Sequence, residues 1–251
     1  MTRRLPMLAA AVLATASVAL TLLVGVGRQP AVAAESRGAV PAPLVDEALA
    51  KTSRSETAIL SGGCFWGMQL VFQHVRGVRE VISGYTGGER STAHYEDVST
   101  GTTGHAESVE IVFDPHVVSY GTLLRVYFSA ATDPTELDYQ GPDQGSQYRG
   151  VIWPTSGVQR RIAESYVEQL EAGHFFPAPI VTRIESARPF YPAEAYHQNF
   201  ATLNPYNLYI MTYDAPKVAA LAQRFPGLYV ARPTLVIASS ARAAAEQGVS
   251  R

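Results

Sequence analysis

The chain has 251 residues, 47% of them hydrophobic, which is enough for one large domain or two small ones. Its formal net charge of -2 gives no electrostatic reason to expect nucleic-acid binding. The single cysteine, Cys64, excludes an internal disulfide and any metal site built from several cysteines. The six histidines show no metal-ligand spacing either, so no metal site is predicted.

The N-terminal segment has the layout of a secretion signal. Arg3 and Arg4 precede a run of about twenty mostly apolar residues, and an A-x-A cleavage pattern follows. We expect residues 1–34 to be a signal peptide or, because this run is long for a signal, an uncleaved membrane anchor. In both cases the positive flank predicts that the remainder is exported, to the periplasm or the extracellular space. Residues 35–56 are polar and without periodicity, which is typical of a linker.

Cys64 lies between a short apolar run at residues 57–60, predicted to be a strand, and a run with helical spacing at residues 68–75. It should therefore occupy a glycine-rich strand-to-helix turn, in the first turn of the helix. The partial positive charge of a helix N-terminus stabilises a thiolate. The alternative is a buried structural cysteine, but the flanking glycines and the adjacent Phe65 and Trp66 favour a reactive thiol beside an apolar pocket.

The rest of the chain mixes strands and helices without strict alternation. Apolar runs and alternating patterns predict strands at residues 78–83, 108–113, 148–153 and 180–184. Helical spacing predicts helices that begin after an N-cap at Ser119, at residues 158–172 and at residues 194–203. The signals weaken from Lys217 onward. We therefore predict one α+β domain at residues 57–215, a mixed sheet covered by helices, and a C-terminal extension at 216–251.

Two carboxylates and a phenol outside the Cys64 segment could carry chemistry. The pair His105 and Glu107 resembles that of zinc deaminases, but the cysteines those enzymes need are absent. Glu107 is either an ordinary strand-end glutamate or a partly buried acid whose raised pKa keeps its proton. Asp143 lies in a glycine-rich turn, where a turn role is favoured on local sequence alone, although its carboxylate could bind a peptide main chain. Tyr148 is expected to begin a strand with its hydroxyl free to enter a cleft.

Three motifs together resemble the A class of the peptide methionine sulfoxide reductases: GCFWG at residues 63–67, GHAE at 104–107 and GxDxGxQYR at 141–149. Shorter matches are GYTGG at 84–88, YEDV at 95–98, DPT at 133–135 and AYHQ at 195–198. The resemblance covers roughly residues 57–213. It implies a two-layer α/β sandwich of ferredoxin-like character and an enzyme specific for the S epimer of methionine sulfoxide.

Carried over residue by residue, the resemblance implies a site with one nucleophile, one acid and a shaped pocket. Cys64 would attack the sulfoxide sulfur, and Glu107 would protonate the sulfoxide oxygen. The other matching residues are Tyr95 and Tyr148 as hydrogen-bond donors to that oxygen, Phe65 and Trp66 around the methyl group, Asp143 on the substrate main chain, and His197 among the substrate-binding residues.

The chain departs from the family pattern at several positions. Pro142 stands where Asn is usual, Gly150 where Ser follows the Tyr-Arg pair, Thr132 where a His is frequent, and Phe200 where a Tyr is frequent. These departures concern the finer shape of the pocket and its substrate preference, not the chemistry.

A larger departure concerns recycling. Many members resolve the sulfenic acid with a second cysteine past an Asn-Pro pair, but no thiol follows Asn204 and Pro205 in this chain. We therefore expect an external thiol, thioredoxin-like or small, to reduce Cys64 directly, with no bound cofactor. The expected protein is a monomer that repairs oxidised methionines in exported proteins under oxidative stress.

Two other functions stay open at this point. A catalytically silent relative would bind oxidised or Met-rich peptides, but such a binder need not keep the acid Glu107. A thiol peroxidase would also pass through a sulfenic acid, but it should place a cation beside its nucleophile, where this chain has Phe65 and Trp66.

Overall fold

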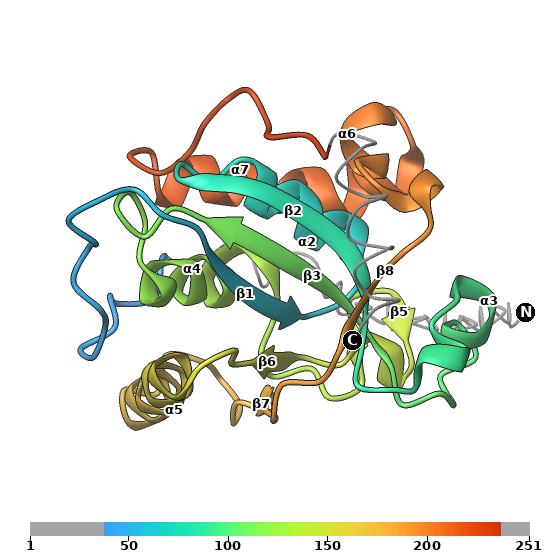
Figure 1. The fold of residues 1–251 in the computed structure, drawn as a ribbon, viewed down its shortest axis with the longest axis horizontal. Coiled ribbons are helices and arrows are strands. Elements are labelled where there is room, and N and C mark those ends of the chain that lie inside the picture. The colour runs from blue at the N-terminus through green and yellow to red at the C-terminus, as the bar shows by residue number, and fades with distance from the viewer. Residues whose placement is uncertain (1–37, 237–251) are drawn as a thin grey trace, which may run out of the picture.

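A computed structural model describes residues 38–236 of the chain (Figure 1). The predicted signal or anchor at residues 1–34, and the end of the predicted C-terminal extension, lie outside the described residues. No helix within the described range is long and apolar enough to cross a membrane.

A six-stranded mixed sheet forms the centre of the fold (Figure 1). Its strands, in spatial order, are β7 (Arg183–Ile184), β6 (Val151–Trp153), β1 (Glu56–Ser61), β3 (Ala106–Phe113), β2 (Val78–Thr86) and β8 (Phe190–Pro192). Only the pair β6–β7 is parallel. A separate two-stranded hairpin consists of β4 (Tyr139–Gln140) and β5 (Asp143–Gln144). The predicted α+β fold with a mixed sheet is confirmed.

Side-chain alternation along β3 gives the sheet one main core face. Val109, Ile111 and Phe113 point into the principal core and are fully buried, as expected for every second residue of a strand. Glu110 and Val112, on the opposite face, stay partly exposed. A small apolar cluster lies on that opposite face and consists of Ile59, Ala106, Val151 and Trp153.

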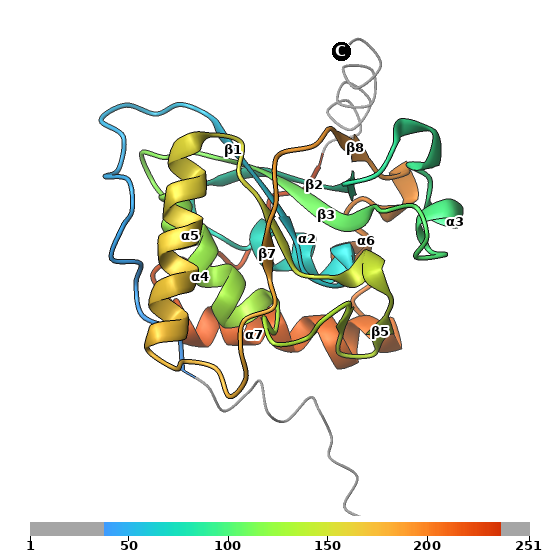
Figure 2. The same cartoon turned by 90° about the horizontal axis from the view of Figure 1, so that it is seen from below.

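Helices cover the core face (Figure 2). They are α2 (Phe65–Gln73), α4 (Tyr120–Val126), α5 (Gly157–Ala172) and α7 (Ala215–Arg224), with the short helices α3 (Tyr95–Val98) and α6 (Phe200–Leu203) near the strand ends. Two π-helical turns interrupt this regular pattern: η2 (Tyr127–Ala131) extends α4, and η5 (Ile210–Asp214) leads into α7. Such turns are frequent at functional sites.

Several predicted elements match and others differ in extent. Ser119 caps α4 as predicted, because its Oγ accepts the N–H of Thr122 at 3.1 Å. Tyr148 does not begin a strand, as was predicted; it ends a 3-10 turn, and the strand starts at Val151. The helix predicted at residues 194–203 is broken, because Asn199 adopts a left-handed conformation (φ 58°) between a 3-10 turn and α6.

The segments before residue 57 and after residue 215 pack on the same core. Residues 38–55 contain no helix or strand, but the Val40 N–H donates to Ser129 Oγ at 3.1 Å and its side chain is buried. Past residue 215, Leu221 of α7 is fully buried and Val236 is nearly so. The packing of the described chain therefore continues across both expected boundaries.

Candidate active site

Cys64 lies in the connection between β1 and α2. It is the N-cap residue of α2, after the turn formed by Gly62 and Gly63. Gly63 has φ 94°, and a Cβ there would lie 2.7 Å from the side chain of Gln140, so only glycine fits this turn. The Gly63 N–H donates to the carbonyl of Tyr148 at 3.1 Å, which ties the turn to the 3-10 segment carrying that tyrosine.

Glu107 reaches the same turn from β3. Its side chain is buried, and Oε2 accepts the backbone N–H of Phe65 at 2.9 Å. Burial raises the pKa of Glu107 to about 8, although the hydrogen bond from Phe65 acts in the opposite direction. Glu107 therefore carries a proton near neutral pH. It is hydrogen-bonded to Phe65, the residue that follows the only cysteine of the chain.

The same burial acts on Cys64. The pKa of its thiol is raised well above its usual value, first by burial and then by the carboxyl groups of Glu107, Asp214 and Asp143. A backbone hydrogen bond with Trp66, in the first turn of α2, opposes this effect. The helix end does favour the thiolate, as predicted from the sequence, but desolvation and the surrounding carboxyls outweigh it. Cys64 is therefore held as a thiol.

An aromatic wall stands beside the thiol. Phe65 is buried, and Trp66 stacks on Phe200 with ring centroids 4.0 Å apart and meets the edge of Tyr209 at 6.2 Å. The Trp66 indole N–H donates to His197 Nδ1 at 3.1 Å. These contacts fix the indole in one orientation.

His197 lies behind this wall. It is 1% exposed, and its ring packs between those of Phe65 and Tyr95, at centroid distances of 4.9 and 4.6 Å. Because Nδ1 accepts the Trp66 N–H, the neutral ring carries its proton on Nε2, which lies 3.9 Å from a carboxylate oxygen of Glu194. Burial lowers the pKa of His197 and favours this neutral form. Its contacts orient the aromatic wall.

The two predicted phenols belong to the same neighbourhood. Tyr95 begins α3 and Tyr148 ends its 3-10 turn, and both pack against the core. Burial raises the pKa of each, and so does the negative charge that Glu107 and Cys64 can carry. Both groups therefore stay neutral O–H donors through the physiological pH range.

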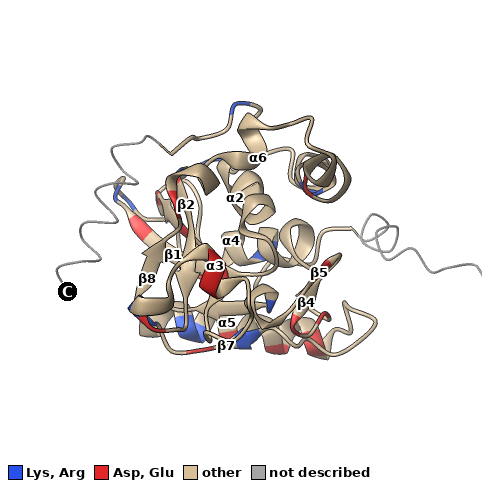
Figure 3. Ribbon diagram, turned by 90° about the vertical axis from the view of Figure 1, so that its right-hand side faces the viewer, with Lys and Arg blue, Asp and Glu red and all other residues tan. Residues whose placement is uncertain are grey.

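Asp143 lies on β5. Its Oδ2 accepts the hydroxyl hydrogen of Tyr209, and the carboxyl group lines a recess of about 840 Å³ together with Gln140, Tyr209 and Lys217. Figure 3 shows α3 and β5 as acidic segments on the same side of the molecule. Burial raises the pKa of Asp143, whereas Tyr209 and Lys217 act in the opposite direction. The carboxyl group thus faces a cavity and does not only support its own turn.

Comparison with known proteins shows where this geometry belongs. The family model for peptide methionine sulfoxide reductase matches residues 56–227. The chain belongs to the peptide methionine sulfoxide reductase family. Peptide methionine sulfoxide reductase MsrA 2 of Mesorhizobium japonicum is 59% identical over 186 residues, which is 74% of this chain and 95% of that protein. The MsrA 2 of Synechocystis is 46% identical over 188 residues, 74% of this chain and 88% of that protein.

Solved structures agree with the family. Methionine sulfoxide reductase A of Corynebacterium diphtheriae superposes with a TM-score of 0.51 at 32% identity, over 61% of this chain and 76% of that one. Reduced Mxr1 from Saccharomyces cerevisiae superposes with a TM-score of 0.54 at 29% identity, over 66% and 97%. The chain is a peptide-methionine (S)-S-oxide reductase. The silent-binder and thiol-peroxidase alternatives are thereby set aside.

Three residues of this reductase site were not singled out from the sequence. The Glu194 carboxylate accepts the Tyr85 hydroxyl hydrogen at 2.8 Å and the Tyr95 backbone N–H at 2.9 Å. Glu194 therefore anchors the start of α3. Tyr209 joins Asp143 to the aromatic wall, and Asp214 is a buried carboxyl that acts on Cys64. All three lie in the last part of the domain, where periodicity is weak and only a three-dimensional contact reveals them.

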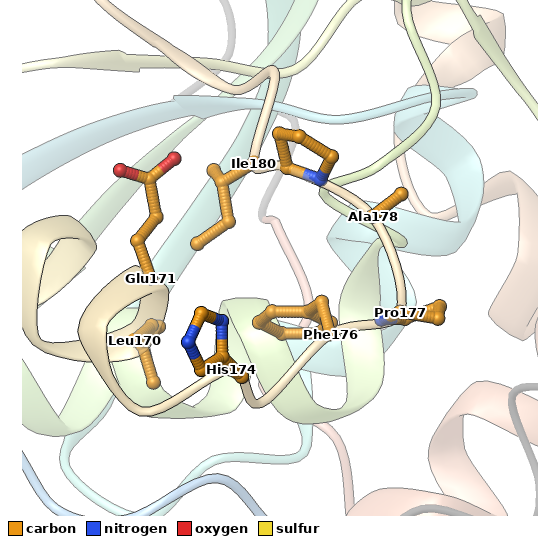
Figure 4. Close-up of a pocket in the computed structure, with 8 residues that line it drawn as sticks. Leu170, Glu171, His174, Phe176, Pro177, Ala178 and Ile180 are labelled. Atoms are coloured by element: carbon orange, nitrogen blue, oxygen red, sulfur yellow. The ribbon is translucent and has the colours of Figure 1, made fainter.

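A second cavity of about 360 Å³ lies at the C-terminal end of α5 (Figure 4). The ring of His174 lies there between Leu170 and Phe176, with Glu171 at the edge. Phe176 lines both this cavity and the recess beside Asp143. Within residues 38–236, no three His, Cys, Asp or Glu side chains are grouped as metal ligands.

Proposed function

We propose that Cys64 and Glu107 carry out the reduction as nucleophile and acid. The Cys64 sulfur attacks the sulfoxide sulfur while the protonated Glu107 donates its proton to the departing oxygen. The thiol proton passes to the Glu107 carboxylate, the hydroxyl group moves to the Cys64 sulfur as the new sulfur–sulfur bond breaks, and methionine leaves Cys64 as a sulfenic acid. The observation that carries this proposal is the buried Glu107, whose pKa near 8 lets it hold a proton at the first turn of α2.

The surrounding side chains then match the parts of the substrate. Tyr95 and Tyr148 supply neutral O–H donors to the sulfoxide oxygen, which is a strong acceptor. Phe65 and Trp66 hold the methyl group against an apolar surface, and His197 supports Trp66 from behind. These assignments agree with the roles implied by the family resemblance.

Asp143 is proposed to hold the substrate main chain. Its carboxylate lies at the rim of the recess, where it can accept a backbone N–H of a peptide. Tyr209 already restrains the Asp143 carboxylate through a hydrogen bond. Binding a peptide therefore loses less side-chain entropy than it would if a freely rotating carboxylate had to be fixed.

Recycling requires an external thiol because Cys64 is the only cysteine. A first thiol attacks the sulfenic sulfur, forms a mixed disulfide and releases water. A second thiol attacks that disulfide, which frees the Cys64 thiol and leaves the reductant as a disulfide. A thioredoxin-like protein or a small thiol can supply both, and the monomer needs no bound cofactor for this cycle.

The proposed clients are oxidised exported proteins, since residues 1–34 have the pattern of a signal peptide or anchor. Cell fractionation with intact-mass analysis tests this. Export predicts a non-cytoplasmic chain, shortened by about 34 residues or retained at full length in the membrane fraction. A full-length chain confined to the cytosol would contradict it.

A single-turnover experiment tests the catalytic roles. The protein is mixed with a racemic methionine sulfoxide peptide without reductant, and dimedone traps any sulfenic acid. We expect one methionine per chain and one dimedone adduct on Cys64, and with dithiothreitol half of the racemate is consumed. Cys64→Ser should give neither product, and Glu107→Gln should slow the burst. Repeated turnover without a thiol would overturn the one-cysteine cycle.

A further inference from the structure

We propose that Asp214 is a further functional residue of this site, a buried carboxyl group that holds the resting Cys64 as a thiol. This inference rests on the proposed function, in which Cys64 is the nucleophile and has no partner cysteine. Asp214 would act through Cys64 and would not touch the substrate, so it is a positioning residue.

Asp214 is placed by an unusual piece of backbone. It ends the π-helical turn η5 and stands at the N-cap position of α7, yet its carboxyl group makes no capping hydrogen bond. An Asp in that position usually accepts an N–H of the first helical turn. The side chain points elsewhere: it is fully buried, and Oδ2 has no hydrogen-bond partner among residues 38–236.

The carboxyl group lies against the first turn of α2. A Cβ at Gly67 would collide with Asp214 Oδ1 and would lie 3.0 Å from Lys217 Nζ. Gly67 follows Cys64 by three residues and lies in the first turn of α2, which Cys64 caps. Because Gly67, the second glycine of the GCFWG motif, has no side chain, it leaves the space that Asp214 and Lys217 occupy.

Lys217 pairs with the carboxyl group and favours its ionised form. Its Nζ lies 3.3 Å from Asp214 Oδ1. Burial raises the pKa of Asp214, whereas Lys217 lowers it through charge and hydrogen bonding. An isolated carboxyl in this position would take up a proton and lose its field. Lys217 also faces Asp143 and Glu136, so the pair belongs to the recess beside the site.

A fixed negative charge here disfavours a thiolate. The charged groups that raise the pKa of Cys64 are Glu107, Asp214 and Asp143, contributed by β3, by the junction of η5 and α7, and by β5. Glu107 must gain and lose its proton during reduction, whereas Asp214 has the Lys217 ammonium group beside it to favour its charged form. The thiolate is the form that oxidants attack, and overoxidation is irreversible. A protein with one cysteine gains protection when that cysteine rests as a thiol.

Alkylation of the full chain by iodoacetamide tests the inference without any substrate. The Cys64 thiolate attacks the methylene carbon and iodide leaves, and since no second cysteine exists, the rate reports this residue alone. The midpoint of the rate-against-pH curve measures ionisation, whereas the plateau at high pH measures access of the reagent. Failure of this test leaves the sulfoxide assay unaffected, and a failed sulfoxide assay leaves this midpoint unaffected.

Asp214→Asn should lower the midpoint by about one pH unit and speed alkylation about tenfold below it. Asp214→Asn/Lys217→Met removes both charges and guards against a misfolded single variant; it should shift the midpoint in the same direction. Glu136→Gln is the matched control, a carboxyl that faces Lys217 but not Cys64, and its midpoint should equal that of wild type. Folded Asp214 variants with an unchanged midpoint, or with only a higher plateau, would overturn the proposal.

Discussion

Burial decides the chemistry of single residues in this site. The Glu107 carboxyl group accepts the N–H of Phe65, the residue that follows Cys64. Glu107 and Cys64 both keep their protons because burial excludes water from them. The acid is therefore available before the substrate arrives. The nucleophile has to lose its proton during the reaction, and in the proposed mechanism Glu107 receives it after giving its own proton to the oxygen.

Glu107→Gln tests the acid directly. The amide cannot donate a proton to the oxygen, so kcat/KM should fall by about 10²- to 10⁴-fold. In wild type the rate should also decline as pH rises above about 8, because Glu107 then ionises. Steady-state assays across pH measure both effects. Glu110→Gln, on the same strand but the opposite face, is the control and should keep full activity.

Trp66→Phe tests the aromatic wall. The ring stays against Phe200, but His197 Nδ1 loses its donor, and an unpaired buried acceptor costs about 1–3 kcal/mol. Urea unfolding should show this loss. Tyr196→Phe retains its ring contact with His197 and changes only a 60% exposed residue, so its unfolding free energy should stay within about 0.5 kcal/mol of wild type. Equal stability of both variants would contradict the role of the indole N–H.

At the scale of elements, the turn between β1 and α2 sets the position of Cys64. Gly63→Ala puts a Cβ into a left-handed backbone and against Gln140. We expect a loss of about 2–4 kcal/mol and reduced activity, since the thiol must shift. Gly141→Ala is a matched control: its φ is also positive, at 54°, but nothing lies within 4 Å. It should lose only about 1–2 kcal/mol. Equal losses in unfolding experiments would show that the contact with Gln140 does not matter.

The segment at residues 38–55 is a second such element. Asp46 accepts the hydroxyl hydrogen of Ser119 at 2.5 Å and the N–H of Gly121 at 3.0 Å, so its charge lies at the N-terminus of α4. Asp46→Ala should cost about 1 kcal/mol of unfolding free energy, because these two donors and the exposed N–H of Glu47 lose their acceptor. The neighbouring Glu47→Ala is the control, since Glu47 is exposed and its carboxyl group makes no such contact. No difference between these two variants in urea titrations would mean that the segment does not support α4.

For the molecule as a whole, the sequence predicted what local chemistry determines. The strand before Cys64, the cap at Ser119 and the apolar alternation of β3 follow from neighbouring residues, and they are confirmed. The break at Asn199 follows from distant partners: Gln198 binds Ser83, and Asn199 binds Gln69. Tyr209 and Asp214 are part of the site only because η5 and α7 pack on α2, and no local pattern carries that information.

The unfolding free energy of the whole molecule should depend on pH because Glu107 is buried. The folded state holds the pKa of Glu107 at about 8, above its ordinary value of 4.5, so folding favours the protonated form. The stability that this difference contributes is complete below pH 4.5 and is lost as pH rises through 8. Glu107→Gln stays neutral at every pH and escapes this loss. Its unfolding free energy relative to wild type should therefore rise between these two values, by at most about 5 kcal/mol, and be flat on either side. Urea titrations of both proteins from pH 4 to pH 9 measure the difference. A constant difference across that range would mean that Glu107 is ionised in the fold, and the acid in the proposed mechanism would have to come from another group.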